Sequence, residues 1–353
     1  MKKSFLYAYD RQNLGDDLFV HTIAGRYPDV QFYMWSDRKN RDAFACLPNL
    51  TVIDQNSRFV HLLHRLRPSL VARYKGWLEK RCEAVVYIGG SIFMEYPNWA
   101  QIASWWEWTA QNRPFYVLGA NFGPWHTEGY REKMASIFSD CRDVCFRDRY
   151  SHDLFRDVET VRMAPDILFS YPMPDVPVKE KQVFVSVINC AGRDESHDLS
   201  GCDERYVANM ARLLQTYLDA GHSLVLASFC KEEGDEEGIV KILSAMGARG
   251  NPRIRVLCYN GTNAAELTTA IAESECVIAT RFHATILAMA AGRPVLPIIY
   301  SDKTKHVLED LDFLGTVYDL RDNVTWAPAV PTIVKAPTDQ AQAHFEKLDA
   351  VLK

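Results

Sequence analysis

Arg281 and His283 have the clearest chemical potential in this sequence, because a fixed cation and an imidazole lie two positions apart. A guanidinium group can hold a carboxylate or phosphate through paired hydrogen bonds. An imidazole, with an ordinary pKa near ~6.5, can donate and accept protons at neutral pH. Together with Lys303 and Lys305, these residue types predict an anion pocket that contains a proton donor. Spacing alone leaves open the alternative that Arg281 pairs with a carboxylate and His283 has a structural role.

Three predicted elements would position these side chains. The apolar run 276–280 is typical of a buried strand, the spacing over 282–292 predicts a helix, and the run 294–300 predicts another strand. Arg281 would then lie where a strand ends and a helix begins. At such a junction, free backbone N–H groups and the helix dipole favour an anion.

A second arginine has the same relation to a predicted strand. Arg147 directly follows the short apolar run 144–146. Arg149 lies two residues further along, so either of the two side chains could face a site.

Two glycine-containing turns follow predicted strands in the first half. In the loop 10–17, Gly15 permits a tight turn and Asp16 or Asp17 can cap the helix that follows. After the strand 84–88, Gly90 permits close approach of a ligand or of another backbone. Both patterns are also ordinary in turns that have no further role.

Several motifs of this chain resemble the polysaccharide pyruvyl transferase family. They are, in chain order, N-L-G-D-D from Asn13, G-G-S-I-F from Gly89, G-A-N-F-G-P from Gly119, R-D-R-Y-S from Arg147, A-P-D ending at Asp166, and R-F-H-A from Arg281 with G-R-P-V and Y-S-D-K after it. Their common order is more specific than any one motif. The resemblance covers most of the chain, although residues 30–110 match only loosely.

Strands alternate with helices on both sides of a proline-rich segment. This alternation predicts an α/β fold of two doubly wound, Rossmann-like parallel-sheet domains facing a cleft, which resembles the GT-B architecture of the family. We expect an N-terminal, acceptor-side domain over 1–172, a linker over 173–182, a C-terminal domain on the phosphoenolpyruvate side over 183–335, and a terminal helix over 336–353 that packs back on the first domain.

The resemblance implies that a pyruvyl group passes from phosphoenolpyruvate to two hydroxyls of a sugar, giving a cyclic ketal. The sugar would belong to a polysaccharide or lipid-linked oligosaccharide precursor. Phosphoenolpyruvate is a donor substrate, and no cofactor or metal is expected, because arginines can balance the charge of the leaving phosphate. The alternatives are a GT-B glycosyltransferase that uses a nucleotide sugar and a non-catalytic sugar-binding relative.

The same resemblance assigns roles to individual residues. The residues implied to bind phosphoenolpyruvate are Arg147, Arg281, Phe282, His283 and Lys303, and the motif favours Arg147 over Arg149. The residues implied to bind the acceptor are Asn13, Gly15, Asp16, Gly90, Ser91 and Asn121. His283 would donate and recover protons, and Asp16 or Asp166 would deprotonate a sugar hydroxyl. Asp166 could instead pair with one of the arginines.

The second half contains a clear amphipathic helix and an acidic loop. The stretch 205–218 is the clearest helix of the chain, with Val207, Met210, Leu214 and Leu218 on one face. The loop 231–237 is acidic. We expect its carboxylates to be solvated helix caps rather than metal ligands, because the spacing of a calcium loop is absent.

Composition limits the class of protein. A hydrophobic content of 48% and a charged content of 24% over 353 residues are ordinary for a globular protein. The formal net charge of −5 argues against general nucleic-acid binding. Nine scattered cysteines without a C-x-x-C pair favour a reducing compartment, and the apolar runs are too short for a signal peptide or a membrane span. We therefore expect a cytoplasmic location.

The stretch 58–81 is basic and amphipathic. It contains seven Lys and Arg residues against one acidic residue, Glu79. Its apolar residues recur at helical spacing, and Pro68 divides the stretch into two helices. It could make a peripheral contact with the inner face of a membrane, or it could be the solvated face of two core helices.

Overall fold

The computed structural model describes residues 1–9, 11–191, 199 and 201–353. Asp10, the first residue of the loop predicted before the first helix, lies outside the described residues.

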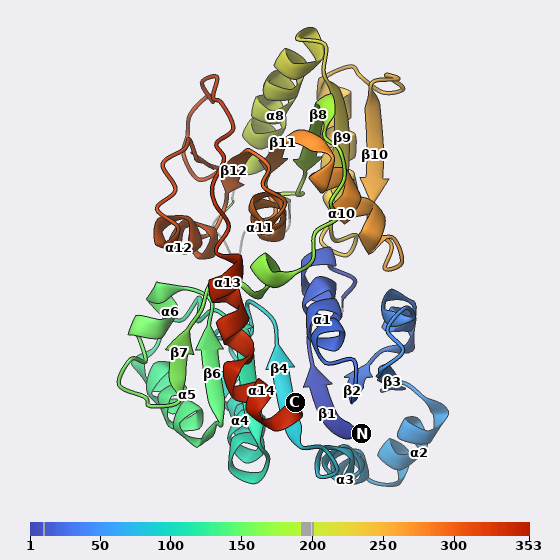
Figure 1. Cartoon of the computed structure of the whole chain (residues 1–353), viewed down its shortest axis with the longest axis vertical. Coiled ribbons are helices and arrows are strands. Elements are labelled where there is room, and N and C mark those ends of the chain that lie inside the picture. Colours follow the sequence, from blue (N-terminus) through green and yellow to red (C-terminus); the bar gives the residue numbers. More distant parts are fainter. Residues whose placement is uncertain (10, 192–198, 200) are drawn as a thin grey trace. The chain divides into compact units, whose positions relative to one another are not determined.

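The described residues form two compact units, each built on its own parallel sheet (Figure 1). Unit 1 contains residues 1–9, 16–167 and 339–353, and unit 2 contains residues 11–15 and the described part of 168–338. The chain therefore passes from one unit to the other before residue 11, after residue 15 in the first turn of the first helix, after residue 167 and after residue 338. The predicted fold class, two doubly wound parallel-sheet domains, is confirmed for both units.

Unit 1 contains a seven-stranded parallel sheet of order β3-β2-β1-β4-β5-β6-β7. Its strands are β1 Lys2–Tyr7, β2 Val30–Ser36, β3 Leu50–Asp54, β4 Ala84–Ile88, β5 Phe115–Ala120, β6 Asp143–Phe146 and β7 Val161–Met163. The central strands are apolar and buried on both faces, as parallel sheets covered by helices require. The strand order reverses between β1 and β4, which places a topological switch point there.

The helical segments linked to this sheet differ in length and regularity. They are α1 Leu14–Arg26, η1 Arg38–Phe44, α2 Arg58–Leu66, α3 Pro68–Glu79, α4 Trp99–Asn112, α5 Glu128–Asp140, α6 Arg149–Asp153, η3 Gln342–Phe345 and α14 Glu346–Leu352. Two further short segments, η2 Ile167–Ser170 and α13 Thr338–Ala341, span the points at which the chain passes from one unit to the other. The predicted division at Pro68 is confirmed. Proline is tolerated as the first residue of a helix because the N–H group that it lacks has no intrahelical partner there.

Unit 2 contains a six-stranded parallel sheet of order β10-β9-β8-β11-β12-β13. Its elements are β8 Lys179–Ser186, α8 Cys202–Asp219, β9 Ser223–Ser228, α9 Asp235–Ala245, β10 Ile254–Cys258, α10 Ala264–Ala272, β11 Ser274–Ala279, α11 Phe282–Ala290, β12 Val295–Ile299, α12 Asp302–Asp310 and β13 Tyr318–Asp319. Because β8 begins at Lys179, the last four residues of the expected linker lie in this strand.

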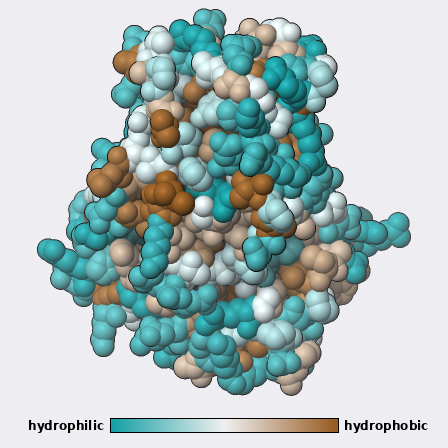
Figure 2. Space-filling model, turned by 45° about the horizontal axis from the view of Figure 1, so that its top comes forward, coloured by the Kyte–Doolittle hydropathy of each residue, from teal (hydrophilic) through white to brown (hydrophobic). Residues whose placement is uncertain are grey.

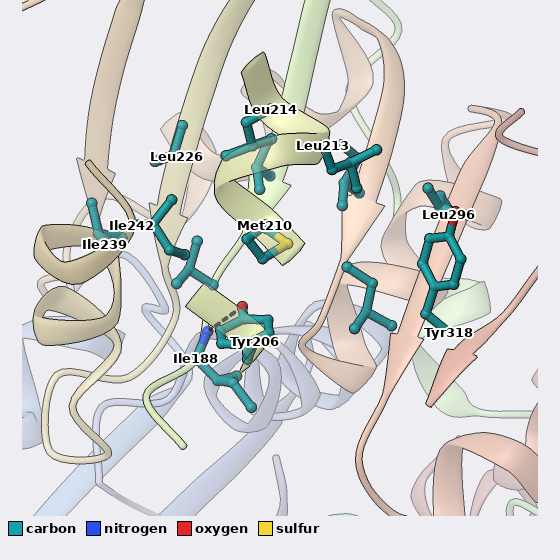
Figure 3. Packing of buried hydrophobic residues seen from close by; sticks show 14 of the residues in the cluster. Ile188, Tyr206, Met210, Leu213, Leu214, Leu226, Ile239, Ile242, Leu296 and Tyr318 are labelled. Atoms are coloured by element: carbon teal, nitrogen blue, oxygen red, sulfur yellow. Dashed lines mark hydrogen bonds between the residues drawn. The ribbon is translucent and has the colours of Figure 1, made fainter. Parts of the chain in front are cut away.

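One core cluster of unit 2 contains buried side chains of α8, α9 and the sheet (Figure 3). The predicted apolar face of α8 is confirmed, since Met210, Leu214 and Leu218 are buried. Tyr206 is fully enclosed in this core, and its hydroxyl accepts the N–H of Ile188 at 3.3 Å. The same hydroxyl lies 3.1 Å from Thr280 Oγ1 and so fixes the residue that follows β11.

The C-terminal segment completes unit 1. Asp349 of α14 forms an ion pair with Arg26 (2.6 Å) and accepts the hydroxyl of Tyr27 (2.7 Å). Arg162 Nη2 donates to the backbone oxygen of His344 (2.7 Å), and His344 Nε2 lies 2.9 Å from the backbone oxygen of Pro165. These contacts attach the last residues of the chain to the end of the first sheet.

His344 makes unit 1 sensitive to acid. Burial lowers its pKa from the ordinary value to about 3, and the charge of Arg162 acts in the same direction. Between about pH 6.5 and pH 3, the unfolded chain binds a proton that the folded chain excludes, so stability falls as the pH falls.

We expect the free energy of unfolding to fall by roughly 2 kcal/mol on going from pH 7 to pH 5. The His344→Gln variant should lose this dependence, as measured by urea unfolding at both pH values, whereas the exposed-site control His126→Gln should keep it. An equal dependence in both variants would show that His344 is not its source.

Hydrophobic side chains are concentrated in the two cores. Figure 2 shows a face on which hydrophilic residues predominate and hydrophobic ones form small separate groups. In the described part of the chain, no helix is both long enough and apolar enough to cross a membrane.

Candidate functional site

Arg281 lies in a buried ionic cluster at the carboxyl end of β11. Its Nε donates to Asp235 Oδ2 (2.9 Å), its Nη2 pairs with Asp235 Oδ1, and its Nη1 pairs with Glu233 Oε2. Only 7% of the Arg281 side chain is exposed, and Asp235 is fully buried. The alternative left open by the spacing, an arginine paired with carboxylates, is therefore what the structure shows.

The two carboxylates fix the charge state of this cluster. Burial acts to lower the pKa of Arg281, but the negative charges of Asp235 and Glu233 outweigh burial and raise this pKa well above its ordinary value. Asp235 Oδ2 also accepts the backbone N–H groups of Phe229 and Cys230, each at 2.9 Å. The ion pair therefore joins the loop after β9 to the start of α11.

The loop before α1 is held against the same cluster. Asn13 forms an antiparallel β-bridge with Cys230, and the N–H of Leu14 donates to the backbone oxygen of Phe229 (3.0 Å). Asn13 Nδ2 donates to Glu233 Oε1 at 3.5 Å, and Asn13 Oδ1 accepts the N–H of Gly15 at 3.2 Å. Unit 2 therefore brings together two motifs from opposite ends of the sequence.

The imidazole of His283 lies directly on Gly15. A Cβ atom built on Gly15 would overlap the His283 ring, with Nδ1 as the nearest atom. His283 is the second residue of α11, and its orientation depends on the strand end before it. There Ser186 Oγ accepts the N–H groups of Thr280 (3.0 Å) and Arg281 (3.1 Å). Glycine is required at position 15 because no side chain fits between the loop and the ring.

We therefore expect Gly15→Ala to displace the His283 ring. Overpacking of this kind should lower the free energy of unfolding by about 1–3 kcal/mol and shift the imidazole signals of His283 in the NMR spectrum. Gly25→Ala is the matched control, since Gly25 lies in the same helix with nothing within 4 Å of its added Cβ. That control should raise stability by roughly 0.5–1 kcal/mol and leave His283 unchanged. Equal behaviour of the two variants would contradict the close packing of Gly15 and His283.

Phe282 and Lys303 lie at the same sheet edge as Arg281. Phe282 is buried as the first residue of α11, with its ring centroid 5.0 Å from that of His283. Lys303 lies in the first turn of α12 and is partly exposed. Because β11 and β12 are parallel neighbours, their carboxyl ends and the helices that follow share one edge of the sheet.

Unit 1 holds a second buried cluster around Arg147, at the carboxyl ends of β4, β5 and β6. Arg147 Nη1 pairs with Asp166 Oδ2 (3.0 Å), and Nη2 donates to Asn121 Oδ1 (2.6 Å). Ser91 Oγ donates to the same Asn121 oxygen at 3.3 Å. A Cβ atom on Gly90 would lie 2.6 Å from the guanidinium of Arg147, so glycine is required there too. The predicted residues Gly90, Ser91, Asn121, Arg147 and Asp166 therefore lie together.

The orientation of the two neighbouring arginines is clear. The Arg147 side chain is 1% exposed and Asp166 is fully buried, whereas Arg149 is exposed. Asp166 thus has the pairing role that the sequence allowed as an alternative to proton transfer. Asp16, which follows Gly15 in the chain, is partly exposed and belongs to unit 1.

Sequence reasoning missed the two carboxylates that hold Arg281. The acidic loop 231–237 was expected to carry solvated caps, and this prediction is wrong for Asp235, which is buried in the ion pair. The signal that could have found them is the pair Glu233 and Asp235 on either side of Gly234, in the loop that follows β9. Gly234 has a positive φ of 78°, which turns the chain at this point. Among the described residues, no group of three or more His, Cys, Asp and Glu side chains is arranged to hold a metal ion.

Comparison with known proteins agrees with the motifs. The model of the polysaccharide pyruvyl transferase family matches residues 13–302. The amylovoran biosynthesis protein AmsJ of Erwinia amylovora is 21% identical over 252 residues, which are 66% of this chain and 60% of AmsJ. The chain therefore spans less than two thirds of the length of this curated relative.

Solved structures with a similar fold include two sugar-nucleotide proteins. HepE of Anabaena, in complex with UDP and glucose, has a TM-score of 0.56 and 11% identity, covering 100% of this chain and 92% of HepE. The UDP-GlcNAc 2-epimerase of Methanocaldococcus jannaschii has a TM-score of 0.57 and 9% identity, covering 99% of this chain and 100% of the epimerase. At these identities the similarity shows the fold alone, and this fold is the GT-B-like one.

Proposed function

The chain belongs to the polysaccharide pyruvyl transferase family, and we propose that it transfers the pyruvyl group of phosphoenolpyruvate to two hydroxyls of a sugar. The acceptor would be part of a polysaccharide or lipid-linked oligosaccharide precursor. The observation that carries the proposal is the cluster in unit 2, where His283 lies on Gly15 and Arg281 is fixed beside it. Two family motifs thus meet around one group that can transfer protons.

The proposed reaction has two steps. In the first step, C3 of phosphoenolpyruvate gains a proton, and a sugar hydroxyl forms a C–O bond to C2 and loses its own proton to a base. In the second step, the other hydroxyl attacks C2, the bond from C2 to the phosphate oxygen breaks, and the second hydroxyl proton leaves with phosphate or a base. One proton is taken up at C3 and two are released from hydroxyls, so a single group that both donates and accepts protons suffices for the first step.

His283 is the residue that we assign to this proton transfer. The packing of Gly15 against its ring holds the imidazole in one place. A fixed imidazole can protonate C3 and accept the proton of the attacking hydroxyl without a change of position. Asp16, next to Gly15 in the chain, is our assignment for a base toward the sugar, while Asp166 is already engaged by Arg147.

Phosphoenolpyruvate needs more cations than Arg281 alone supplies. The group of Arg281, Asp235 and Glu233 has a formal charge of −1 and by itself repels an anion. Lys303 and the positive end of the α11 dipole would attract the phosphate and carboxylate instead. Arg281 Nη1 carries two N–H groups and uses one of them for Glu233 Oε2, so the same nitrogen could donate to a substrate oxygen while the ion pair persists. The substrate oxygen would then lie beside the Glu233 carboxylate, and Lys303 would have to offset the repulsion between the two anions.

The cluster in unit 1 is suited to a neutral, polar ligand. Asn121 Oδ1 accepts from both Arg147 and Ser91, which fixes the amide so that its Nδ2 group is the donor. An amide donor and a serine hydroxyl beside a glycine turn are suited to the hydroxyls of a sugar, which supports our assignment of Gly90, Ser91 and Asn121 to the acceptor. Arg147 would then position Asn121, and a direct contact with phosphoenolpyruvate stays a prediction.

The test is incubation of the protein with phosphoenolpyruvate and a panel of nitrophenyl and lipid-linked sugars, followed by measurement of phosphate release. We expect release only when both substrates are present. A parallel incubation with UDP-sugars tests the glycosyltransferase alternative. Transfer of sugar from UDP without consumption of phosphoenolpyruvate would replace our proposal with that alternative. Binding of neither donor would favour the non-catalytic alternative.

A further inference from the structure

Helices α2 and α3 expose large apolar side chains that a core helix would bury. The exposed fractions are 53% for Phe59, 55% for Leu62, 63% for Leu66 and 50% for Trp77. In α2 only Val60 is buried, and in α3 only Glu79 is. The expectation of a solvated face on two core helices is therefore wrong for this stretch. Figure 1 shows both helices at the margin of unit 1.

The exposed apolar residues form one face. Phe59, Leu62 and Leu66 have the spacing i, i+3 and i+7, which places them along one side of α2. The half-buried ring of Tyr74 connects this side to α3. It contacts the Phe59 ring edge-on at 5.3 Å and stacks with Trp77 at 6.2 Å between centroids. We call the exposed residues of 58–81 the α2–α3 surface.

Cations surround the apolar side chains. The exposed ones are Arg58, Arg65, Arg67, Arg73, Lys80 and Arg81. The one acidic residue of the stretch, Glu79, is buried. Its Oε1 accepts a hydrogen bond from the Tyr7 hydroxyl, and its Oε2 lies 3.5 Å from Arg113 Nε. Within the residues that the structure describes, no carboxylate lies within ion-pair distance of Arg58, Arg65, Arg67 or Arg73. A chain with a net charge of −5 thus concentrates uncompensated positive charge at one place.

We propose that the α2–α3 surface docks on an anionic lipid bilayer, with Phe59, Leu62, Leu66 and Trp77 in the headgroup region and the arginines on lipid phosphates. An interfacial helix combines these same two features, an apolar side and flanking cations. A second copy of the chain is disfavoured as the occupant, because a two-fold contact would oppose cations to cations. The inference is independent of the proposed pyruvyl transfer, since it concerns lipid binding and not turnover.

The exposed apolar residues distinguish this docking from a purely electrostatic attraction. Cations near an anionic surface each contribute roughly fivefold to binding, and salt removes that part. The buried apolar side chains contribute a part that salt does not remove. Binding to anionic vesicles should therefore weaken at high salt without disappearing.

Co-sedimentation of the full chain with vesicles tests the proposal. One set contains phosphatidylcholine alone, and the other contains phosphatidylcholine with phosphatidylglycerol. We expect strong binding only to the anionic set. Replacement of Arg65, Arg67 and Arg73 by Gln should weaken it roughly 100-fold at low salt. The matched control replaces Arg142, Arg156 and Lys335, which are also exposed, by Gln and should bind as the unmodified protein does.

A second pair of variants tests the apolar part. Serine in place of Phe59, Leu62 and Leu66 should remove most of the binding that persists at high salt, with Trp77 as the remaining apolar contact. Serine in place of Leu314, Val330 and Ile333, which are exposed in unit 2, should not. Absence of binding at low salt, or equal loss in both members of either pair, would overturn the proposal. A dimer in light scattering that the first serine variant dissociates would assign the surface to a second copy instead.

Discussion

Replacing His283 with alanine should lower turnover by roughly 10²–10⁴-fold, the usual contribution of a positioned acid–base group. The fold should persist, because the His283 ring is only partly buried and is not part of the core cluster of unit 2. Phosphoenolpyruvate binding should persist as well, since Lys303 and the α11 dipole are unchanged. The measurement is steady-state phosphate release with calorimetric binding of phosphoenolpyruvate.

His126→Ala is the control for this variant, because His126 is an exposed histidine of unit 1. It should retain full activity. Near-normal turnover of His283→Ala on a verified acceptor would remove His283 from the proton-transfer role. Loss of phosphoenolpyruvate binding together with turnover would instead give His283 a binding role.

Replacing Arg281 with alanine should lower the free energy of unfolding of unit 2 by about 3–5 kcal/mol. The variant leaves the fully buried Asp235 without its cationic partner, and an unpaired buried carboxylate is costly. Urea unfolding of both proteins at pH 7 measures this loss.

Arg321 provides a matched control in the same unit. It also pairs with two carboxylates, Asp302 and Asp319, but 31% of its side chain is exposed. Solvent screens such pairs, so Arg321→Ala should cost no more than about 1 kcal/mol. Equal losses from the two substitutions would show that burial does not set the strength of the Arg281 cluster. Arg281→Lys keeps the charge without the planar fork, and it should lie between the unmodified protein and the alanine variant.

Local patterns in the sequence were sufficient for most of the fold. The strand 84–88 has its predicted limits, and the predicted helix 205–218 lies within α8, because apolar runs and helical spacing are local properties. The first helix starts at Leu14 rather than near residue 17. The short strands β7 and β13 were not predicted, since two or three residues carry no periodicity.

The sequence predicted individual residues of the candidate site, but it did not predict which of them contact one another. Motif resemblance pointed to Gly15 and His283 separately, and nothing in their spacing said that the ring would lie on the glycine. Asp235 is a buried partner that the sequence presents as one carboxylate in an acidic run. Its burial depends on the turn at Gly234 and on the position of β11, which are tertiary properties.

Exposure was the other property that periodicity could not decide. The spacing of Phe59, Leu62 and Leu66 shows that one side of a helix is apolar, but it does not show whether that side faces a core or solvent. In the structure these three side chains are exposed. The apolar pattern of the α2–α3 surface is visible in the sequence, but only the tertiary structure shows that this side is exposed.

The most direct test of pyruvyl transfer is to follow isotope-labelled carbon from phosphoenolpyruvate into the sugar product. Our account predicts that the label appears in a cyclic ketal bridging two sugar hydroxyls, with one phosphate released per ketal formed. It also predicts that His283→Ala yields almost none of this product. A product that contains a sugar from UDP-sugar and no label, or a labelled product formed equally well by His283→Ala, would contradict it.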